Sequence, residues 1–436
     1  MSENERPSGA RSEDRSGART GVSAQVAGAV AAAHDEHWSA VLATTLGLVR
    51  DLDLAEDSVQ EAFLRALEVW ERDGVPANPA GWLVIAARRR ALDVIRRGET
   101  LRRKLPLLVW DEDTSDADAS VEPTDADGPT PPRIEDETAP VVLDEQLRLI
   151  FLAAHPALAP EARIALTLRL VGGVSTADIA AAFLVSEATM AARLTRAKKR
   201  IRLSRIPCRV PDADQIDARV VDVLDVISVL IATGGMEDAA QRMLETLHEL
   251  LPAQTEPQGL LAQTLSLRAR DATRTDARGR PVALADQDRR RWDRDLLDRA
   301  DALVLDGLSR GGRGPYLIQG AIAAAVALPA RHEDVDWTEV LDLYDALLEH
   351  WPTAIVQLGR VVALAETAGP RSALHRLTPL AEDLAEHRPF HVIRGELLDR
   401  TGAHAEAADA FRTALACRGD EQADPLLLEM IANTEA

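Results

Sequence analysis

Two short stretches of the chain are rich in arginine and lysine, and they could bind phosphate groups. The segment 86–104 has eight basic residues against two acidic ones, and the segment 186–205 has seven against one. Guanidinium and ammonium groups neutralise phosphates and displace counterions from nucleic acid. Such contacts position a protein, while other side chains read the bases. The two stretches therefore predict binding to nucleic acid.

Side chains that could carry out catalysis do not gather anywhere in the sequence. It has no glycine-rich phosphate loop, no nucleophile elbow, no H-E-x-x-H motif and no cluster of metal ligands. Cys208 and Cys417 lie far apart, without another Cys or His at ligand spacing, which is typical of isolated reduced thiols. We therefore expect no catalytic residue, no metal site and no cofactor.

The formal net charge of −21 argues at first against a nucleic-acid-binding protein. The acidic residues, however, lie mostly outside the two basic stretches, and the segment 111–139 alone has eleven of them against one arginine. Exposed charges are screened beyond about 8–10 Å at ordinary salt. The local basic stretches therefore decide phosphate contact, and the net charge does not exclude DNA.

The composition predicts an all-helical protein of several domains. The 436 residues are 46% hydrophobic but only 3% aromatic, with abundant alanine and leucine. The sequence lacks an apolar stretch long enough to span a membrane and lacks a secretory signal, so we expect a cytoplasmic protein without membrane contact. We predict a disordered N-terminal tail at 1–33, a helical domain at 34–104, an acidic, proline-rich linker at 105–140, a helix-turn-helix domain at 141–207 and a helical-repeat domain at 208–436.

The segment 55–70 predicts an amphipathic helix. Asp57, Gln60 and Glu61 lie off its apolar face, and on their own these three residues could be no more than a solvated surface. The apolar face repeats every three or four positions and consists of Val59, Ala62, Phe63, Ala66, Leu67 and Trp70.

A further helix is predicted to begin near Trp82, after the prolines at 76 and 79. Arg89, Arg96 and Arg97 can share one of its faces and follow phosphates, and Arg88 precedes them. Trp82 either packs in the core or lies beside an opened DNA strand.

The segment 175–201 predicts a helix-turn-helix. Ser175 and Asp178 form a capping-box pattern, and Ser186 is placed to cap the second helix. A helical hairpin with a solvated basic face is the alternative. In the helix-turn-helix interpretation, Glu187, Ala188, Thr189 and Arg193 face base edges, Arg196, Lys198 and Lys199 contact phosphates, and Thr176 also lies at the DNA.

These blocks resemble the extracytoplasmic-function (group IV, sigma-70 type) sigma factors of bacterial RNA polymerase. D-x-x-Q-E-x-F followed by P-x-x-W-L-x-x-x-A-R-x-R-A-L-D-x-x-R-R is similar to sigma region 2, and S-x-x-D-I-A-x-x-F-L-V-S-x-x-T-M-x-x-R-L-x-R-A is similar to region 4. The resemblance implies that Asp57, Gln60, Glu61 and Phe63 dock on the clamp helices of the polymerase β′ subunit. It also implies that the segment from Trp82 to Arg97 and the loop before it bind and melt the −10 element, and that region 4 binds the −35 element and the β flap.

One residue departs from the region 2 pattern. The family usually has asparagine where this chain has Arg89. Arginine can still contact phosphate, so we expect docking to be preserved while promoter preference changes.

The part beyond residue 208 resembles the C-terminal tetratricopeptide-like extension of one sigma-factor subgroup. Gly395, Gly402, Ala407, Phe411 and Ala414 have the spacing of small and large residues that such a repeat uses. The subgroup's F-N-E-G-Y-like motif near residue 233 is absent. The charged stretch 268–293 is either an ion-paired loop or a contact surface for polymerase or for region 2, which would be an intramolecular contact.

The sequence therefore predicts a sigma factor that binds core RNA polymerase and directs promoter-specific initiation. Two alternatives stay open. One is a helix-turn-helix regulator with a ligand-sensing helical domain, which would bind its operator without polymerase. The other is a sigma-like scaffold whose repeat domain binds partners without initiating transcription.

Overall fold

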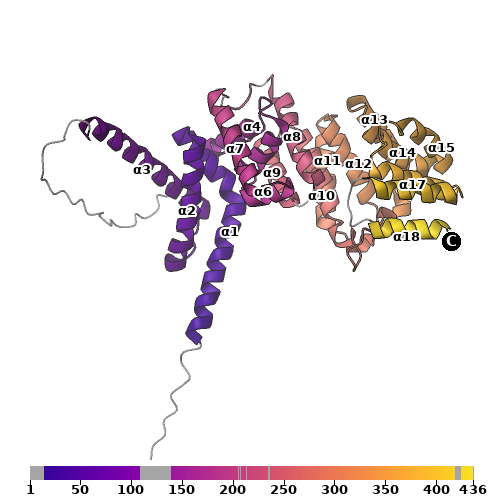
Figure 1. Cartoon of the computed structure of the whole chain (residues 1–436), viewed down its shortest axis with the longest axis horizontal. Helices are drawn as coiled ribbons and strands as arrows, with labels where there is room; N and C mark the ends of the chain where they lie inside the picture. The colour runs from indigo at the N-terminus through magenta and orange to yellow at the C-terminus, as the bar shows by residue number, and fades with distance from the viewer. Residues whose placement is uncertain are drawn as a thin grey trace, which may run out of the picture. The chain divides into compact units, whose positions relative to one another are not determined.

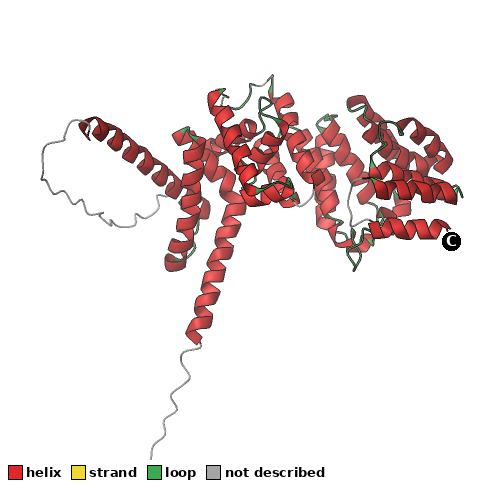
Figure 2. Ribbon diagram, viewed as in Figure 1, coloured by secondary structure: helices red, strands yellow, loops and turns green. Residues whose placement is uncertain are grey.

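The computed structural model describes residues 14–108, 139–204, 206, 208–212, 214–233, 236–417 and 424–435 (Figures 1 and 2). These residues form helices and no strand, apart from an isolated bridge between Thr275 and Pro281. The predicted all-helical fold is confirmed. The chain divides into two compact units, Met1–Met243 and Leu244–Ala436.

The first unit begins with a group of long helices, in which α1 packs on α2, α3 and α4 and α2 packs on α3. The helix α5, a helix-turn-helix (α6 and α7) and the helix α8 follow. The bounds are α1 Asp14–Val49, α2 Leu52–Asp73, α3 Pro79–Leu108, α4 Ala139–Ala153, α5 Pro160–Leu170, α6 Thr176–Ala182, α7 Glu187–Leu203 and α8 Ile216–Thr233; α9, Glu237–Leu250, contains the boundary between the units.

Residues 14–33, predicted from the sequence to belong to a disordered tail, form the first part of α1. Val26, Val30 and Ala33 are buried at a spacing of four and three residues, so this half of the helix has a packed face. Residues 1–13 lie outside the described part. The predicted linker agrees with the ends of α3 and α4 to within four residues, and its residues 109–138 also lie outside the described part.

Local capping explains where α2 and α3 begin. The Asp51 side chain accepts a hydrogen bond from the Leu54 amide at 3.0 Å, and the Asn78 side chain accepts one from the Gly81 amide at 2.8 Å. Gly74 ends α2 with a φ of 86°, a conformation that favours glycine. The apolar face predicted for α2 is buried except for Leu67, which is 38% exposed.

The helix-turn-helix capping prediction is confirmed. The Ser175 hydroxyl accepts a hydrogen bond from the Asp178 amide at 3.1 Å, and the Ser186 hydroxyl accepts one from the Thr189 amide at 3.2 Å. Leu184, in the turn between α6 and α7, has a φ of 52° and is 94% exposed. The two caps set where α6 and α7 begin.

The helix α8 belongs with the first unit, although residues 208–436 were predicted to form one domain. It packs on α4 and α5, and the Arg219 guanidinium donates to the Phe151 carbonyl at 2.8 Å. The sequence alone placed this helix with the repeat region, because it is next to that region in the chain. Its contacts are instead with the helix-turn-helix domain.

The second unit is a succession of helices, each packed on helices one or two positions along the chain. Their bounds are α10 Glu256–Arg268, α11 Arg294–Ser309, α12 Pro315–Ala327, α13 Trp337–His350, α14 Ala354–Ala368, α15 Pro370–Leu377, α16 Arg388–Asp399, α17 His404–Ala416 and α18 Asp424–Glu435. Within the described residues of the chain, no helix is long and apolar enough to cross a membrane.

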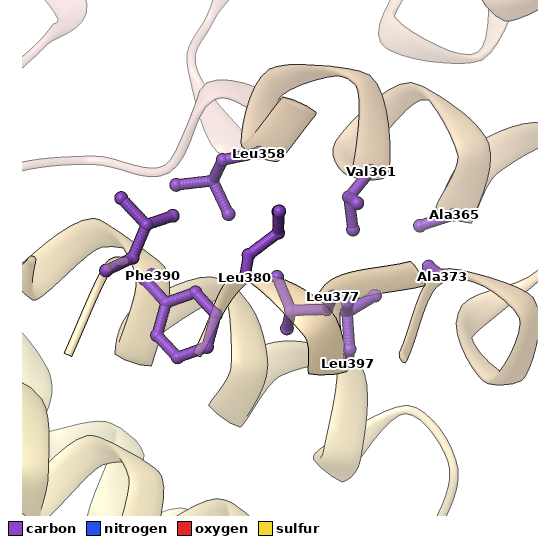
Figure 3. Packing of buried hydrophobic residues seen from close by; sticks show 9 residues of the cluster. Leu358, Val361, Ala365, Ala373, Leu377, Leu380, Phe390 and Leu397 are labelled. Carbon is purple, nitrogen blue, oxygen red and sulfur yellow. The ribbon is translucent and has the colours of Figure 1, made fainter. Parts of the chain in front are cut away.

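Two cores of this unit are formed by segments that follow one another in the chain. Figure 3 shows Leu358 and Val361 of α14 on one side and Leu377, Leu380 and Phe390 from the following segments on the other. In the next hairpin the small-to-large packing predicted for α16 and α17 is present. A Cβ on Gly395 would lie 2.4 Å from the Phe411 ring, and Phe411 is buried.

Glycine permits an especially close contact between α10 and α12. A Cβ on Gly259 would lie 2.2 Å from the Leu317 Cα, and a Cβ on Gly320 would lie 2.4 Å from the Gly259 carbonyl oxygen. Both obstacles are backbone atoms, which cannot rotate away. Even one added methyl group would therefore force the two helices apart.

We expect Gly259→Ala to destabilise the second unit by about 1–3 kcal/mol, the usual cost of overpacking a core. Urea unfolding of the full chain measures the change. Ala302→Ser, at an exposed position of α11, is the control and should stay within about 0.5 kcal/mol of the parent. Equal stability of Gly259→Ala and the parent would contradict the close contact.

The charged stretch 268–293 contains several ion pairs. Arg274 contacts Asp271 at 3.4 Å, and Arg280 contacts Asp276 at 2.7 Å and Glu429 at 2.9 Å. These pairs are the ones that the ion-paired interpretation predicts. A role of this loop in contacting polymerase stays a prediction.

Candidate nucleic-acid interface

The arginines predicted to follow DNA phosphates lie along the outer surface of α3. Arg88, Arg89, Arg96 and Arg97 are exposed, while Ala87 and Ala91 on the opposite face are buried. Their exposure gives α3 a basic surface that a phosphate backbone can reach. The arrangement is the one predicted from the sequence.

Trp82, at the start of α3, is partly buried. Its ring packs edge to face on the ring of Trp70, with 5.7 Å between the centroids. This contact anchors the N-terminal end of α3 on α2. Both interpretations of Trp82 are therefore compatible with its position, since one part of the ring packs and another part faces solvent.

The surface predicted to bind polymerase lies on α2. Asp57 and Glu61 are exposed, and Gln60 is partly buried with its amide donating to the Glu56 carboxylate at 3.4 Å. Leu64 is 61% exposed beside them. Leu67, 38% exposed, lies one turn further along, so the two leucines add apolar surface beside the exposed carboxylates. Sequence inspection missed Leu64, and its place off the apolar stripe was the signal that could have found it.

Phe63 is not part of this surface, although it was predicted with it. The side chain is 7% exposed and packs between the rings of His34 and Trp38, with centroid separations of 5.2 and 6.0 Å. Phe63 is in phase with the buried stripe of α2, so its role is to hold α1 against α2. The exposed surface of α2, which we call the α2 outer face, consists of Asp57, Glu61, Leu64 and Leu67.

We expect Phe63→Ala to destabilise the first unit by about 3–5 kcal/mol, because it removes a buried aromatic side chain. Leu64→Ala, one residue further along, is the control and should change stability by less than about 0.5 kcal/mol. Chemical unfolding followed by tryptophan fluorescence measures both. Unchanged stability of Phe63→Ala would return this residue to the surface.

The N-terminal end of α7 is accessible to a DNA groove. Glu187, Ala188 and Thr189 are exposed, and Thr176 on α6 is partly exposed. Arg196 and Lys199 are exposed further along α7. These side chains are therefore accessible, and their contact with DNA stays a prediction.

Arg193 was predicted to point outward, but it is half-buried. Its guanidinium lies 5.4 Å from the ring centroid of Phe183, and one of its terminal nitrogens is buried without a hydrogen-bond partner. The stacking fixes the side chain across the turn between α6 and α7. In this conformation the half-buried Arg193 side chain therefore stabilises the turn between α6 and α7.

Lys198 was predicted to contact phosphate, but in this structure its ammonium group is paired with carboxylates of α2. It lies 2.8 Å from Glu56 and 3.0 Å from Asp53. Burial alone would lower the pKa of Lys198, but the Glu56 and Asp53 carboxylates more than offset this and raise it above its ordinary value. The ammonium group of Lys198 is therefore charged, and in this conformation it is already paired with the carboxylates of α2.

Glu56 joins α2 to two helices of the helix-turn-helix domain. Besides Lys198 of α7 it contacts Arg169 of α5 at 2.5 Å, and its own side chain is 7% exposed. Arg169 also lies 5.5 Å from the Trp38 ring centroid of α1. We call Glu56, Arg169, Lys198 and Asp53 the interdomain cluster. No sequence pattern indicated it, because its members are up to 145 residues apart.

A close apolar contact lies beside the interdomain cluster. Gly173, in the loop before α6, has a φ of 67°, and a Cβ there would lie 3.0 Å from both His34 and Trp38. The loop therefore packs directly on α1. In this conformation the helix-turn-helix domain is held against the first helical block by ion pairs and by packing.

Among the described residues, no group of three or more His, Cys, Asp and Glu side chains could hold a metal ion. Cys208 is exposed, and Cys417 is partly exposed. The surfaces of the first unit that a partner could contact are therefore the basic surface of α3, the N-terminal end of α7 and the α2 outer face.

Three family models match the chain. They are Sigma-70 region 2 at residues 34–100, Sigma-70, region 4 at residues 148–201, and a family of unknown function (DUF6596) at residues 231–307. The first match covers α2 and the basic surface of α3, and the second covers the helix-turn-helix. The fold and these surfaces therefore define the class: a sigma factor of the sigma-70 type.

Similar proteins show to which family of sigma-70 type sigma factors the chain belongs. The ECF RNA polymerase sigma factor SigL of Mycobacterium tuberculosis is 32% identical over 186 residues, which are 42% of this chain and 93% of SigL. The probable ECF RNA polymerase sigma factor SigI of the same organism is 31% identical over 186 residues, or 58% of its length. This chain belongs to the extracytoplasmic-function family of RNA polymerase sigma factors.

A longer match includes the second unit. The uncharacterized protein R00370 of Rhizobium meliloti is 39% identical over 379 residues, which are 84% of this chain and 86% of that protein. A solved human IFIT1 dimer with PPP-AAAA is 15% identical, with a TM-score of 0.29 over 67% of this chain and 75% of that chain. A score this low does not show a shared fold, and a tetratricopeptide-like second unit stays a prediction.

Membership of this family has direct consequences. Sigma factors bind DNA in transcription initiation and are not enzymes, and their domains imply interaction with core RNA polymerase and promoter DNA. Which polymerase subunits and which promoter bases this chain contacts stays a prediction.

Proposed function

We propose that this protein binds core RNA polymerase through the α2 outer face and directs initiation at promoters with a −10 and a −35 element. The β′ clamp helices are the proposed partner of the α2 outer face, and the β flap is the proposed partner of the helix-turn-helix domain. The basic surface of α3 with Trp82 contacts the −10 element, and α7 contacts the −35 element.

The exposure of the α2 outer face is the observation that carries this proposal. Asp57 and Glu61 are exposed one helical turn apart, and Leu64 and Leu67 place apolar surface next to them. A free protein gains nothing from exposed leucines, whereas a partner helix can bury them. The carboxylates then fix the orientation of that partner.

Lys198 adds a condition to this proposal. A phosphate contact by Lys198 requires it to leave Glu56 and Asp53. We therefore infer that promoter binding separates α7 from α2. The same movement leaves the acidic residues of α2 free of the helix-turn-helix domain.

Binding of core polymerase by charge-reversed variants tests the docking surface. Asp57→Lys combined with Glu61→Lys is expected to weaken binding by about one-hundredfold or more, because two carboxylates of an interface core are replaced by like charges of the wrong sign. Asp342→Lys with Glu349→Lys, two exposed acids of α13, is the control for the change in net charge. Equal affinity of the two double variants would reject the α2 outer face as the docking surface.

A further inference from the structure

The second unit contains a pocket of about 380 Å³ between α10, α12, α13 and α14. This volume lies in the range of small-molecule binding sites. The pocket is independent of the surfaces proposed for polymerase and promoter. Its walls are mostly apolar, with Leu267, Ile322, Val326, Trp337, Leu347 and Val356 among them.

Arg270 is the charged side chain among the described residues that line this pocket. Two contacts fix it: its Nε donates to the Gln287 amide oxygen at 3.2 Å, and its guanidinium lies 5.6 Å from the Trp292 ring centroid. The Gln287 amide is itself oriented, since it donates to the Val282 carbonyl at 2.9 Å. Within the described residues, the two terminal nitrogens of Arg270 donate no hydrogen bond.

The surroundings of Arg270 do not neutralise its charge. The neighbouring Asp271 carboxylate is paired with Arg274, and the Arg289 guanidinium, over the same Trp292 ring, donates to the Val326 and Pro329 carbonyls. Burial, together with the nearby Arg274 and Arg289, lowers the pKa of Arg270 to about 10, although the Asp271 carboxylate acts in the opposite direction. Among the described residues no carboxylate forms an ion pair with Arg270, so it is a charged, half-buried cation whose burial is costly without a bound anion.

Other polar groups of the pocket are also without a partner. The Ser266 hydroxyl is buried and makes no hydrogen bond, and none is recorded within the described residues for the side chains of Gln263, Gln319 and Tyr344. Burial raises the pKa of Tyr344, so its hydroxyl stays protonated. Buried polar groups are usually paired, and unpaired ones around an apolar pocket are suited to orient a bound molecule.

We propose that this pocket binds a small monocarboxylate with an aliphatic or aromatic body, whose carboxylate pairs with Arg270. The planar fork of a guanidinium fits a carboxylate through two parallel hydrogen bonds. One cation without a counterion matches one negative charge, and the apolar walls match an uncharged body. The site lies partly in the segment matched by the family of unknown function, and the proposal does not depend on polymerase binding.

Ligand-detected NMR on the full chain tests the proposal with a series of ω-phenylalkanoates of two to eight chain carbons. The matched alcohols and amines carry the same bodies with other head groups. We expect at least one carboxylate to bind at millimolar concentration or below, about tenfold to one-hundredfold more tightly than its alcohol, and its amine not to bind. Binding of none of the carboxylates, or equal binding of carboxylate and alcohol, would overturn the proposal.

Three variants locate the binding. Arg270→Gln should reduce the affinity for the carboxylate to that of the alcohol, and Ala323→Leu, which fills the pocket wall, should abolish binding of both. Arg371→Gln, an exposed arginine of α15, is the control and should bind as the parent does. Circular dichroism and the melting temperature establish that each variant is folded. Unchanged carboxylate binding by folded Arg270→Gln or folded Ala323→Leu would also overturn the proposal.

Discussion

Replacing Glu56 with glutamine is expected to separate α7 from α2 and to strengthen DNA binding by the free protein. The substitution leaves Arg169 and Lys198 without the carboxylate that contacts both, although their side chains are only 14% and 17% exposed. Removing one partner of a buried ion pair costs about 3–5 kcal/mol. Moving the two cations into water or onto phosphates relieves this cost, so the interface opens before the unit unfolds.

The salt dependence of binding to a non-specific DNA duplex measures this effect. Each additional phosphate contact steepens the plot of log binding constant against log salt concentration by about 0.9, so release of Lys198 and Arg169 should steepen it by roughly one to two. Glu61→Gln makes the same change of charge at an exposed position of α2 and should leave most of the slope unchanged. Identical slopes for the two variants would mean that the interdomain cluster does not withhold cations from DNA.

The second large effect is expected on the basic surface of α3. Reversing the charge of Arg88 and Arg89 together removes two exposed cations and adds two repulsive carboxylates. A hydrogen bond to a charged group contributes about 1.5–3 kcal/mol, so promoter-dependent transcription should fall by about one-hundredfold or more. Binding to core polymerase should persist, because the α2 outer face is intact.

An abortive-initiation assay at constant salt compares this double variant with its control. Arg371→Glu with Arg376→Glu changes the net charge equally at exposed positions of α15 and should initiate as the parent does. Equal activity of both double variants would exclude the outer surface of α3 from promoter contact.

Local features of this fold follow from the sequence. The caps at Ser175 and Ser186 involve residues three positions apart, and the buried stripe of α2 is set by helical periodicity. The exposure of the arginines of α3 follows from the buried alanines on the other face. Such features depend on neighbours within a few residues, and they could be predicted.

Features that depend on distant parts of the chain could not be predicted. Glu56 is indistinguishable in sequence from a solvated helix carboxylate, and only the fold brings Arg169 and Lys198 to it. The same holds for Arg270, which belongs to the charged stretch 268–293 and which only the fold brings to the wall of a pocket. The burial of Phe63, in contrast, was indicated by its place in the apolar stripe and was overridden by the family resemblance.

Transcription in vitro from pooled fragments of the host genome, with core polymerase in the presence and absence of this protein, tests the central claim most directly. We predict discrete new transcription starts that share one −35 and −10 pair and that disappear with Asp57→Lys combined with Glu61→Lys. Core polymerase that gives the same transcripts with and without the protein would contradict the proposed function.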